Sequence, residues 1–200
     1  MPTLLYIHGF LSSPQSAKAR LTQEWLREYR PDWHYECPAL SSYPVQARAT
    51  LENTCARLGC NDAVYLIGSS LGGFWATYLA ERYGFPAVLV NPAVHPQRRF
   101  GELVGQTLKN YHTAETYRLT QADLDELEAC APQSLRNTDL YWLMVQTGDE
   151  VLDYRLAVEF YQGCRQTVER GGNHTFEGFE NWLAEIADFF ASFVQTPTTP

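Results

Sequence analysis

The sequence has little of what builds a disulfide scaffold, a secreted precursor or a membrane anchor. Its 200 residues contain only five cysteines, an odd number without a CxxC pair, and the start shows no secretory signal pattern. We therefore expect free thiols in a reducing cytoplasm. No apolar run approaches the roughly 18 residues that a transmembrane helix requires, so we expect no membrane partner.

Positive charge is scarce as well. The chain has 15 lysines and arginines against 23 aspartates and glutamates, a formal net charge of −8. Such a surface repels phosphate backbones, so the composition argues against nucleic-acid binding. We also expect no metal, because the pairs His34 with Cys37 and Cys55 with Cys60 each lack a second pair at ligand spacing.

What the chain does contain is the composition of one globular domain. Hydrophobic residues make up 45% of it and charged residues 19%. A chain of this length can bury about two thirds of its unfolded surface in one core. We expect a single domain over residues 1–194, followed by a flexible tail, "QTPTTP" (195–200), which has no packing pattern.

Short apolar runs alternate with amphipathic stretches. Strands are predicted in the runs "LLYI", "WHYECP", "DAVYLIG", "FPAVLVNPA", "DLYWLMVQTGDE" and "CRQTVERGGNHTF". Helices are predicted between them, and a last helix over about residues 176–194. Because the runs are apolar on both faces, they indicate a parallel sheet covered by helices on both sides.

Residues 92–132 break this rhythm. They show no clear strand, and one helical stretch, "TQADLDELEACA", in which Thr120 and Asp123 form a capping pattern. Long inserts between strands are usually either functional or disordered, and the aromatic residues here favour an ordered lid.

The segment "AVYLIGSSLGGFWATYLAERYG" (63–84) passes from a strand through a tight turn into a helix. Its pentapeptide "GSSLG" matches GxSxG with Ser70 at the centre, flanked by Gly68 and Gly72. A turn this sharp lifts the central side chain to the top of the sheet and requires very small residues two positions before and after it. We predict that Ser70, and not Ser69, is a nucleophile.

A serine hydroxyl needs a base, and the base needs a group that fixes its tautomer. "GGNHTF" places His174 in a glycine-rich loop after the last strand, and we predict that it is the base. The acid is expected after the penultimate strand, where "TGDEVLDY" offers Asp149, Glu150 and Asp153. Asp149 is preferred because it directly follows the strand's glycine, whereas Asp153 precedes a helix and is expected to cap it.

The stretch "YIHGF" at the end of the first strand completes the candidate site. Backbone N–H groups after the HG pair and after the nucleophile can stabilise a developing oxyanion, and we assign this role to Phe10 and Leu71. His8 is expected to brace the loop without taking part in chemistry.

The motifs "YIHGF", "GSSLGG", "TGDEVLD" and "GGNHTF" resemble those of the α/β-hydrolases. Together with "NPAVHP", and over residues 3–194, the chain is similar to the small YqiA-type bacterial esterases. The resemblance implies a minimal three-layer fold, with about six parallel strands in the order 2-1-3-4-5-6 and a small helical lid after the fourth strand. It also implies hydrolysis of small acyl esters or acyl-CoA thioesters in the bacterial cytoplasm.

The predicted nucleophile Ser70, base His174 and acid Asp149 together indicate a two-step acyl transfer that needs no cofactor. The candidate substrate-binding residues are His95, Arg98, Arg99 and Tyr111. A peptidase, a lactonase or a perhydrolase would use the same three catalytic residues, and the sequence does not separate them. The alternative from another class is a non-catalytic protein of the same fold that binds a ligand or partner; an intact triad argues against it.

Overall fold

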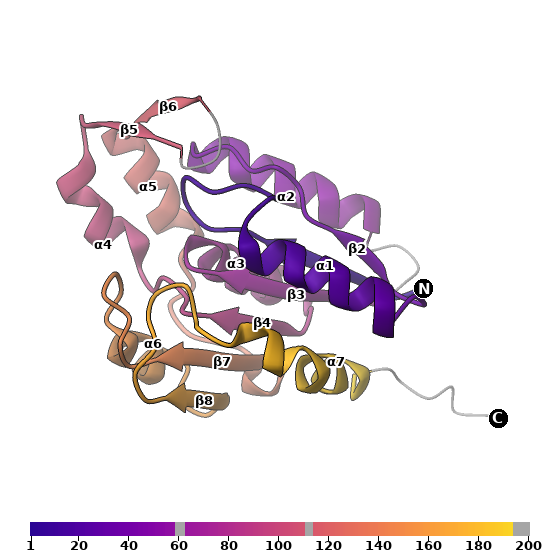
Figure 1. The fold of residues 1–200 in the computed structure, drawn as a ribbon. Helices are drawn as coiled ribbons and strands as arrows, with labels where there is room; N and C mark the ends of the chain where they lie inside the picture. The colour runs from indigo at the N-terminus through magenta and orange to yellow at the C-terminus, as the bar shows by residue number, and fades with distance from the viewer. Residues whose placement is uncertain (59–62, 111–113, 194–200) are drawn as a thin grey trace.

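A six-stranded parallel sheet is the centre of the protein (Figure 1). In spatial order its strands are β2 (His34–Glu36), β1 (Thr3–Ile7), β3 (Val64–Ser69), β4 (Ala87–Val90), β7 (Tyr141–Gln146) and β8 (Arg165–Glu169). The computed structural model describes residues 1–58, 63–110 and 114–193. Because β7 and β8 are the fifth and sixth strands of this sheet along the chain, the predicted order 2-1-3-4-5-6 is confirmed.

Helices cover both faces of the sheet. They are α1 (Ala17–Tyr29), α2 (Pro44–Leu58), α3 (Leu71–Tyr83), α6 (Tyr154–Phe160) and α7 (Leu183–Ala191). Along β1 the side chains alternate: Leu5 and Ile7 pack with residues of α2, α3 and α6, whereas Leu4 and Tyr6 pack with residues of α1 and α7. Within the described ranges, every helix is too short or too polar to cross a bilayer.

The insert expected at residues 92–132 lies between β4 and β7. It consists of α4 (Pro96–Phe100), the 3₁₀ turn η1 (Gly101–Leu103), an antiparallel hairpin of β5 (Thr107–Lys109) and β6 (Thr116–Arg118), and α5 (Gln121–Cys130). The expectation of no strand is wrong, since the insert contains β5 and β6. These strands are only three residues long and largely exposed, so they leave no apolar run in the sequence. The capped helix is confirmed: the Thr120 N–H donates to Asp123 Oδ2 at 2.8 Å.

The insert packs onto the loop that follows β1. The Phe10 ring lies 4.8 Å from the Phe100 ring and 5.4 Å from the Tyr117 ring, measured between centroids. In Figure 1 the insert lies toward the arrowheads of the strands. This carboxyl edge is where parallel α/β sheets usually build their sites.

The last helix is shorter than predicted. Phe176 (φ +60°) and Gly178 (φ +73°) have left-handed backbone, which a right-handed helix cannot contain. The chain therefore passes through the 3₁₀ turn η3 (Phe179–Trp182) before α7 begins at Leu183. Residues 194–200, including the predicted tail, lie outside the described residues.

Candidate active site

A glycine-flanked turn joins β3 to α3. Ser70 occupies this turn with φ +56°, a value that residues other than glycine rarely adopt. A Cβ on Gly68 would lie 2.3 Å from the carbonyl oxygen of Gly72, and a Cβ on Gly72 would lie 2.0 Å from that of Ile7. Only glycine fits at either position, so the predicted sharp turn is confirmed.

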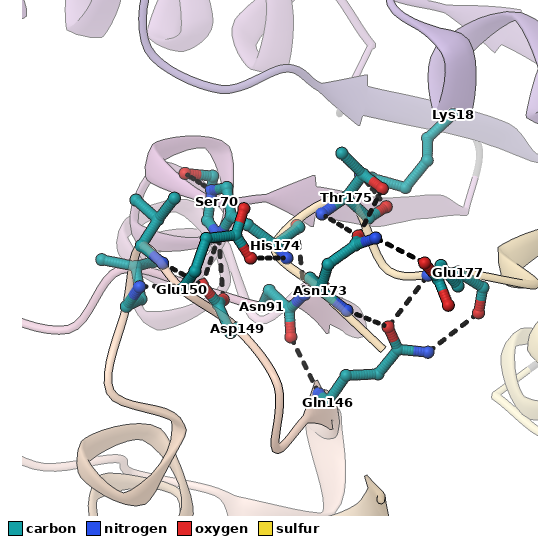
Figure 2. A network of polar contacts seen from close by, with 12 residues as sticks. Lys18, Ser70, Asn91, Gln146, Asp149, Glu150, Asn173, His174, Thr175 and Glu177 are labelled. Atoms are coloured by element: carbon teal, nitrogen blue, oxygen red, sulfur yellow. Dashed lines mark hydrogen bonds and ion pairs between the residues drawn. The ribbon is translucent and has the colours of Figure 1, made fainter. Parts of the chain in front are cut away.

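Ser70, His174 and Asp149 meet at the carboxyl edge of the sheet (Figure 2). Ser70 Oγ lies 3.0 Å from His174 Nε2, and His174 Nδ1 lies 2.9 and 2.8 Å from the two carboxylate oxygens of Asp149. With this geometry Nε2 can take the hydroxyl proton while the carboxylate holds the proton on Nδ1. Ser69, the neighbour of Ser70, is a buried residue at the end of β3, and the hydrogen bond of His174 Nε2 goes to Ser70.

Further hydrogen bonds hold Asp149 in its charged form. Its Oδ1 accepts the backbone N–H groups of Val151 and Leu152, both at 2.8 Å. Burial opposes ionisation, but the hydrogen bonds from His174 and from these two amides outweigh it and lower the pKa of Asp149 below its ordinary value. The group facing the imidazole is therefore a carboxylate at neutral pH.

The two acidic residues that compete with Asp149 in the sequence have other partners. Asp153 is the N-cap of α6: it accepts the Arg155 N–H at 3.0 Å and pairs with the Arg155 guanidinium. Its expected capping role is confirmed. Glu150 accepts the backbone N–H of His174 at 3.0 Å and so fixes the main chain of the histidine, not its ring.

Two backbone amides flank Ser70 where an oxyanion hole is predicted. Leu71 is the first residue of α3, and the N–H groups of a first turn have no partner inside their helix. Gly9 packs against Ser70, since a Cβ on Gly9 would lie 3.3 Å from Ser70 Cβ, and Phe10 follows it. In the part of the chain that the structure describes, no acceptor is hydrogen-bonded to the N–H of Phe10 or Leu71.

The loop before Phe10 is braced by His8, as expected. The His8 side chain is buried, and its Nε2 accepts the backbone N–H of Leu40 at 3.1 Å. Its Nδ1 lies 3.0 Å from the carbonyl oxygen of Gly9. His8 therefore links the loop after β1 to the segment after β2.

A cavity of about 570 Å³ opens at Ser70. Its wall includes His174, Phe10 and Leu71, the first turn of α1, and the segment 174–180. A volume of this size is typical of small-molecule sites.

A second hollow, of about 540 Å³, adjoins this cavity. The two share four lining residues, Ala93, Arg99, Phe100 and Leu152. Of the candidate substrate-binding residues, His95 and Arg98 line the second hollow, and Arg99 lines both. Burial, with the nearby charge of Arg98, lowers the pKa of His95. Tyr111 lies outside the described residues.

Sequence reasoning missed Asn91 and Gln146, which hold the loop of His174 (Figure 2). Asn91 Nδ2 donates to the carbonyl oxygens of Asn173 and His174 at 3.0 and 3.1 Å. Gln146 Oε1 accepts the N–H groups of Asn173 and Glu177 at 3.1 and 2.9 Å. The signal that could have found them is a polar residue at the carboxyl end of an otherwise apolar strand.

The described cysteines are all free thiols; Cys60 lies outside the described residues. Within these same ranges, no cluster of three or more His, Cys, Asp or Glu side chains is arranged to hold a metal ion. His34 and Cys37 belong to no such cluster, and the pair Cys55 with Cys60 lies partly outside the described residues.

The comparison with protein families agrees with the resemblance seen in the sequence. The family model described as "Uncharacterised protein family (UPF0227)" matches residues 3–191, which is nearly the whole chain. The assignment to the YqiA-type family of α/β-hydrolase fold is thereby confirmed.

Solved structures share the fold. Est1E from Butyrivibrio proteoclasticus, with ferulic acid bound, is 15% identical with a TM-score of 0.72, and the match covers 96% of this chain and 89% of that one. Alpha/beta hydrolase domain-containing protein 10 from mouse is 16% identical with a TM-score of 0.72, covering 95% and 90%. A structure of the metagenome-derived lipolytic enzymes LipS and LipT is 17% identical with a TM-score of 0.64, covering 96% and 94%. At these identities the likeness shows the fold alone.

Proposed function

The chain belongs to the UPF0227 family, and from this premise we propose that it is a serine hydrolase that cleaves small carboxylic esters or acyl-CoA thioesters. The observation that carries the proposal is the continuous row of hydrogen bonds from Asp149 through His174 to Ser70. The row ends on a serine in strained backbone beside two unpaired amide N–H groups. Base, nucleophile and oxyanion donors are thus combined at one point.

In the first half of the reaction, Ser70 Oγ attacks the carbonyl carbon of the ester while His174 Nε2 takes its proton. The carbonyl electron pair moves to the oxygen, which the N–H groups of Phe10 and Leu71 stabilise. When the tetrahedral intermediate collapses, the bond to the alcohol or thiol breaks and His174 returns the proton to the leaving group. The acyl group is then an ester of Ser70.

Water completes the reaction. His174 removes a proton from the water molecule as its oxygen attacks the acyl carbon, and the second intermediate collapses by returning the proton to Ser70 Oγ. In both halves Asp149 stays ionised and stabilises the imidazolium, because its pKa is held low. Each step uses only groups of this chain and water, so no cofactor is needed.

The substrate occupies the cavity at Ser70 and extends into the adjoining hollow. The insert of residues 92–132 acts as its lid, with Arg99 on both cavities and His95 and Arg98 on the second. The ferulic acid held by Est1E, a protein of the same fold, supports a small carboxylic acid or ester as ligand. The odd cysteine count and the family resemblance favour the cytoplasm as the site of action.

A fluorophosphonate probe tests the proposal, because it reacts only with activated serines. Wild type, Ser70→Ala and Ser69→Ala would each be treated and their intact masses measured. We expect one probe mass on wild type and on Ser69→Ala, and none on Ser70→Ala. A panel of p-nitrophenyl esters and acyl-CoA thioesters then gives the leaving-group preference. A folded wild type that takes no label and hydrolyses none of the panel contradicts the proposal and favours a non-catalytic binding protein.

A further inference from the structure

Lys18 brings a cation into the cavity of Ser70. It is the second residue of α1, is partly buried, and lines the same cavity as Ser70 and His174. Figure 2 shows its side chain reaching from α1 toward the loop of His174, where Nζ donates to the carbonyl oxygen of Thr175 at 2.7 Å. One N–H of the ammonium is thus used, and two remain for another acceptor.

No acidic side chain that the structure describes neutralises this ammonium. In the described ranges no carboxylate lies within ion-pair distance of Lys18 Nζ. Of the acidic residues on the cavity wall, Glu177 accepts from Asn173 Nδ2 at 2.6 Å, and Glu180 is exposed. The charge of Asp149 favours the Lys18 ammonium, but the Asp149 carboxylate is hydrogen-bonded to His174 and forms no ion pair with Lys18.

The partial burial of Lys18 disfavours its charged form. Burial lowers the pKa of its ammonium to about 8, although the charge of Asp149 acts in the opposite direction. A carbonyl acceptor such as that of Thr175 needs only a neutral donor, which an amide side chain can supply. A charge at this position is therefore explained by a charged ligand better than by loop anchoring.

The first turn of α1 favours the same kind of ligand. Ser16 and Ala17 line the cavity beside Lys18, so the N-terminal end of this helix faces it. The first turn carries no acidic residue, and the Ser16 side chain does not cap it. Unpaired N–H groups and the positive end of a helix dipole attract anions.

We propose that Lys18 and the N-terminus of α1 form a carboxylate-binding subsite, and that the natural substrates are esters bearing a negative charge. This inference rests on the proposed hydrolase function of the same cavity. In a protein with a net charge of −8, an anionic ester is repelled unless a local cation receives it. Lys18 supplies that cation, with Arg99 on the same wall.

Two matched pairs of esters test the subsite and locate the charge. Mono-p-nitrophenyl adipate against p-nitrophenyl hexanoate places a carboxylate on the acyl side. p-Carboxyphenyl hexanoate against its methyl ester places it on the leaving-group side. We expect kcat/KM of wild type to favour the anionic member of one pair by about tenfold, mainly through KM, as a charge-assisted hydrogen bond supplies.

Substitutions at Lys18 separate charge from loop anchoring. Lys18→Gln keeps a donor for the Thr175 carbonyl and removes the charge, so we expect kcat/KM for the anionic and the neutral member of the pair to become equal within about twofold. Lys18→Arg retains the charge and should rescue the preference. Lys109→Gln, a change of the same type on the exposed strand β5, is the matched control and should leave it intact.

Binding measured on Ser70→Ala makes the outcome independent of turnover. We expect the anionic ester to bind about tenfold more tightly than its neutral partner, and Lys18→Gln in this background to abolish the difference. Equal binding within both pairs, or a preference that survives Lys18→Gln, overturns the subsite. A Lys18-dependent preference in binding, without hydrolysis by wild type, supports the subsite and overturns the proposed function instead.

Discussion

Asn91, which directly follows β4, fixes the main chain of His174. Its side-chain amide donates to the His174 carbonyl oxygen at 3.1 Å, and its Oδ1 accepts the backbone N–H of Gln146 at 3.0 Å. Asn91 has a φ of +42°, a backbone that asparagine tolerates better than most residues. One buried side chain therefore joins β4, β7 and the histidine loop, and with them the position of the imidazole.

Asn91→Asp tests this linkage, because it keeps the shape and the preferred backbone but removes both N–H donors. The two carbonyl oxygens would face a carboxylate in place of donors. We expect the free energy of unfolding to fall by about 1–3 kcal/mol, measured by urea denaturation. We expect kcat for a neutral ester to fall about tenfold or more with KM little changed, because a displaced base weakens the chemical step.

The control is Asn53→Asp, which adds the same charge on the exposed surface of α2. It should change stability by no more than about 0.5 kcal/mol and leave kcat unaffected. Equal kinetics in Asn91→Asp and wild type would contradict a role of Asn91 in positioning His174.

The acid of the site is tested by two aspartates four residues apart. Asp149→Asn should lower kcat by about 10⁴-fold, because an amide can hold the imidazole in the wrong tautomer and does not stabilise the imidazolium. Asp153→Ala should cost about 1 kcal/mol of stability through the lost N-cap of α6, with kcat nearly unchanged. Steady-state kinetics with urea unfolding measures both. A large loss of kcat in Asp153→Ala alone would reverse the assignment.

The sequence was informative where one residue type is forced locally. Gly68 and Gly72 leave no room for a Cβ, so five residues of sequence are enough to predict the turn that presents Ser70. The buried strands are similarly visible as apolar runs, and the sheet order follows from the family resemblance. The hydrogen bonds of Ser70, His174 and Asp149 join the residues proposed from motif order.

The parts that could not be predicted depend on contacts between distant segments. The break before α7 lies at Phe176, whose positive φ accompanies burial of its ring and is not signalled by its type. Asn91 and Gln146 act through backbone groups 82 and 31 positions away, and backbone groups carry no pattern in a sequence. Lys18 likewise meets the Thr175 carbonyl oxygen only in the folded chain, 157 positions away in the sequence.

The lack of space for a side chain at Gly72 predicts how an alanine there would change the stability of the fold. A methyl group there would meet the Ile7 carbonyl oxygen, which belongs to a central strand and cannot move away. We expect Gly72→Ala to lower the free energy of unfolding by about 3 kcal/mol or more, or to prevent folding. Gly101→Ala is the control, since nothing lies within 4 Å of its Cβ position and its φ of −52° suits alanine. Similar stability of the two variants would mean that β1 and α3 are not in close contact.

The charge of Lys18 predicts how stability depends on pH. Its pKa is about 8 in the folded protein, below the ordinary 10.5, because burial disfavours the ammonium more than Asp149 favours it. Between these two values the unfolded chain holds a proton that the folded protein has released, so stability gains from rising pH in this window. Below about pH 8 both states are protonated and the full penalty remains.

The comparison with Lys18→Gln isolates this effect, because tyrosines and cysteines that titrate in the same range are common to both proteins. From about pH 7 to about pH 10, the free energy of unfolding of wild type, relative to the variant, should increase, as urea denaturation would show. A bound carboxylate stabilises the ammonium, so excess adipate should raise the stability of wild type at about pH 7 and flatten its dependence on pH. A difference between the two proteins that stays constant with pH would mean that Lys18 is hydrated in the folded state and that its burial does not favour an anionic ligand.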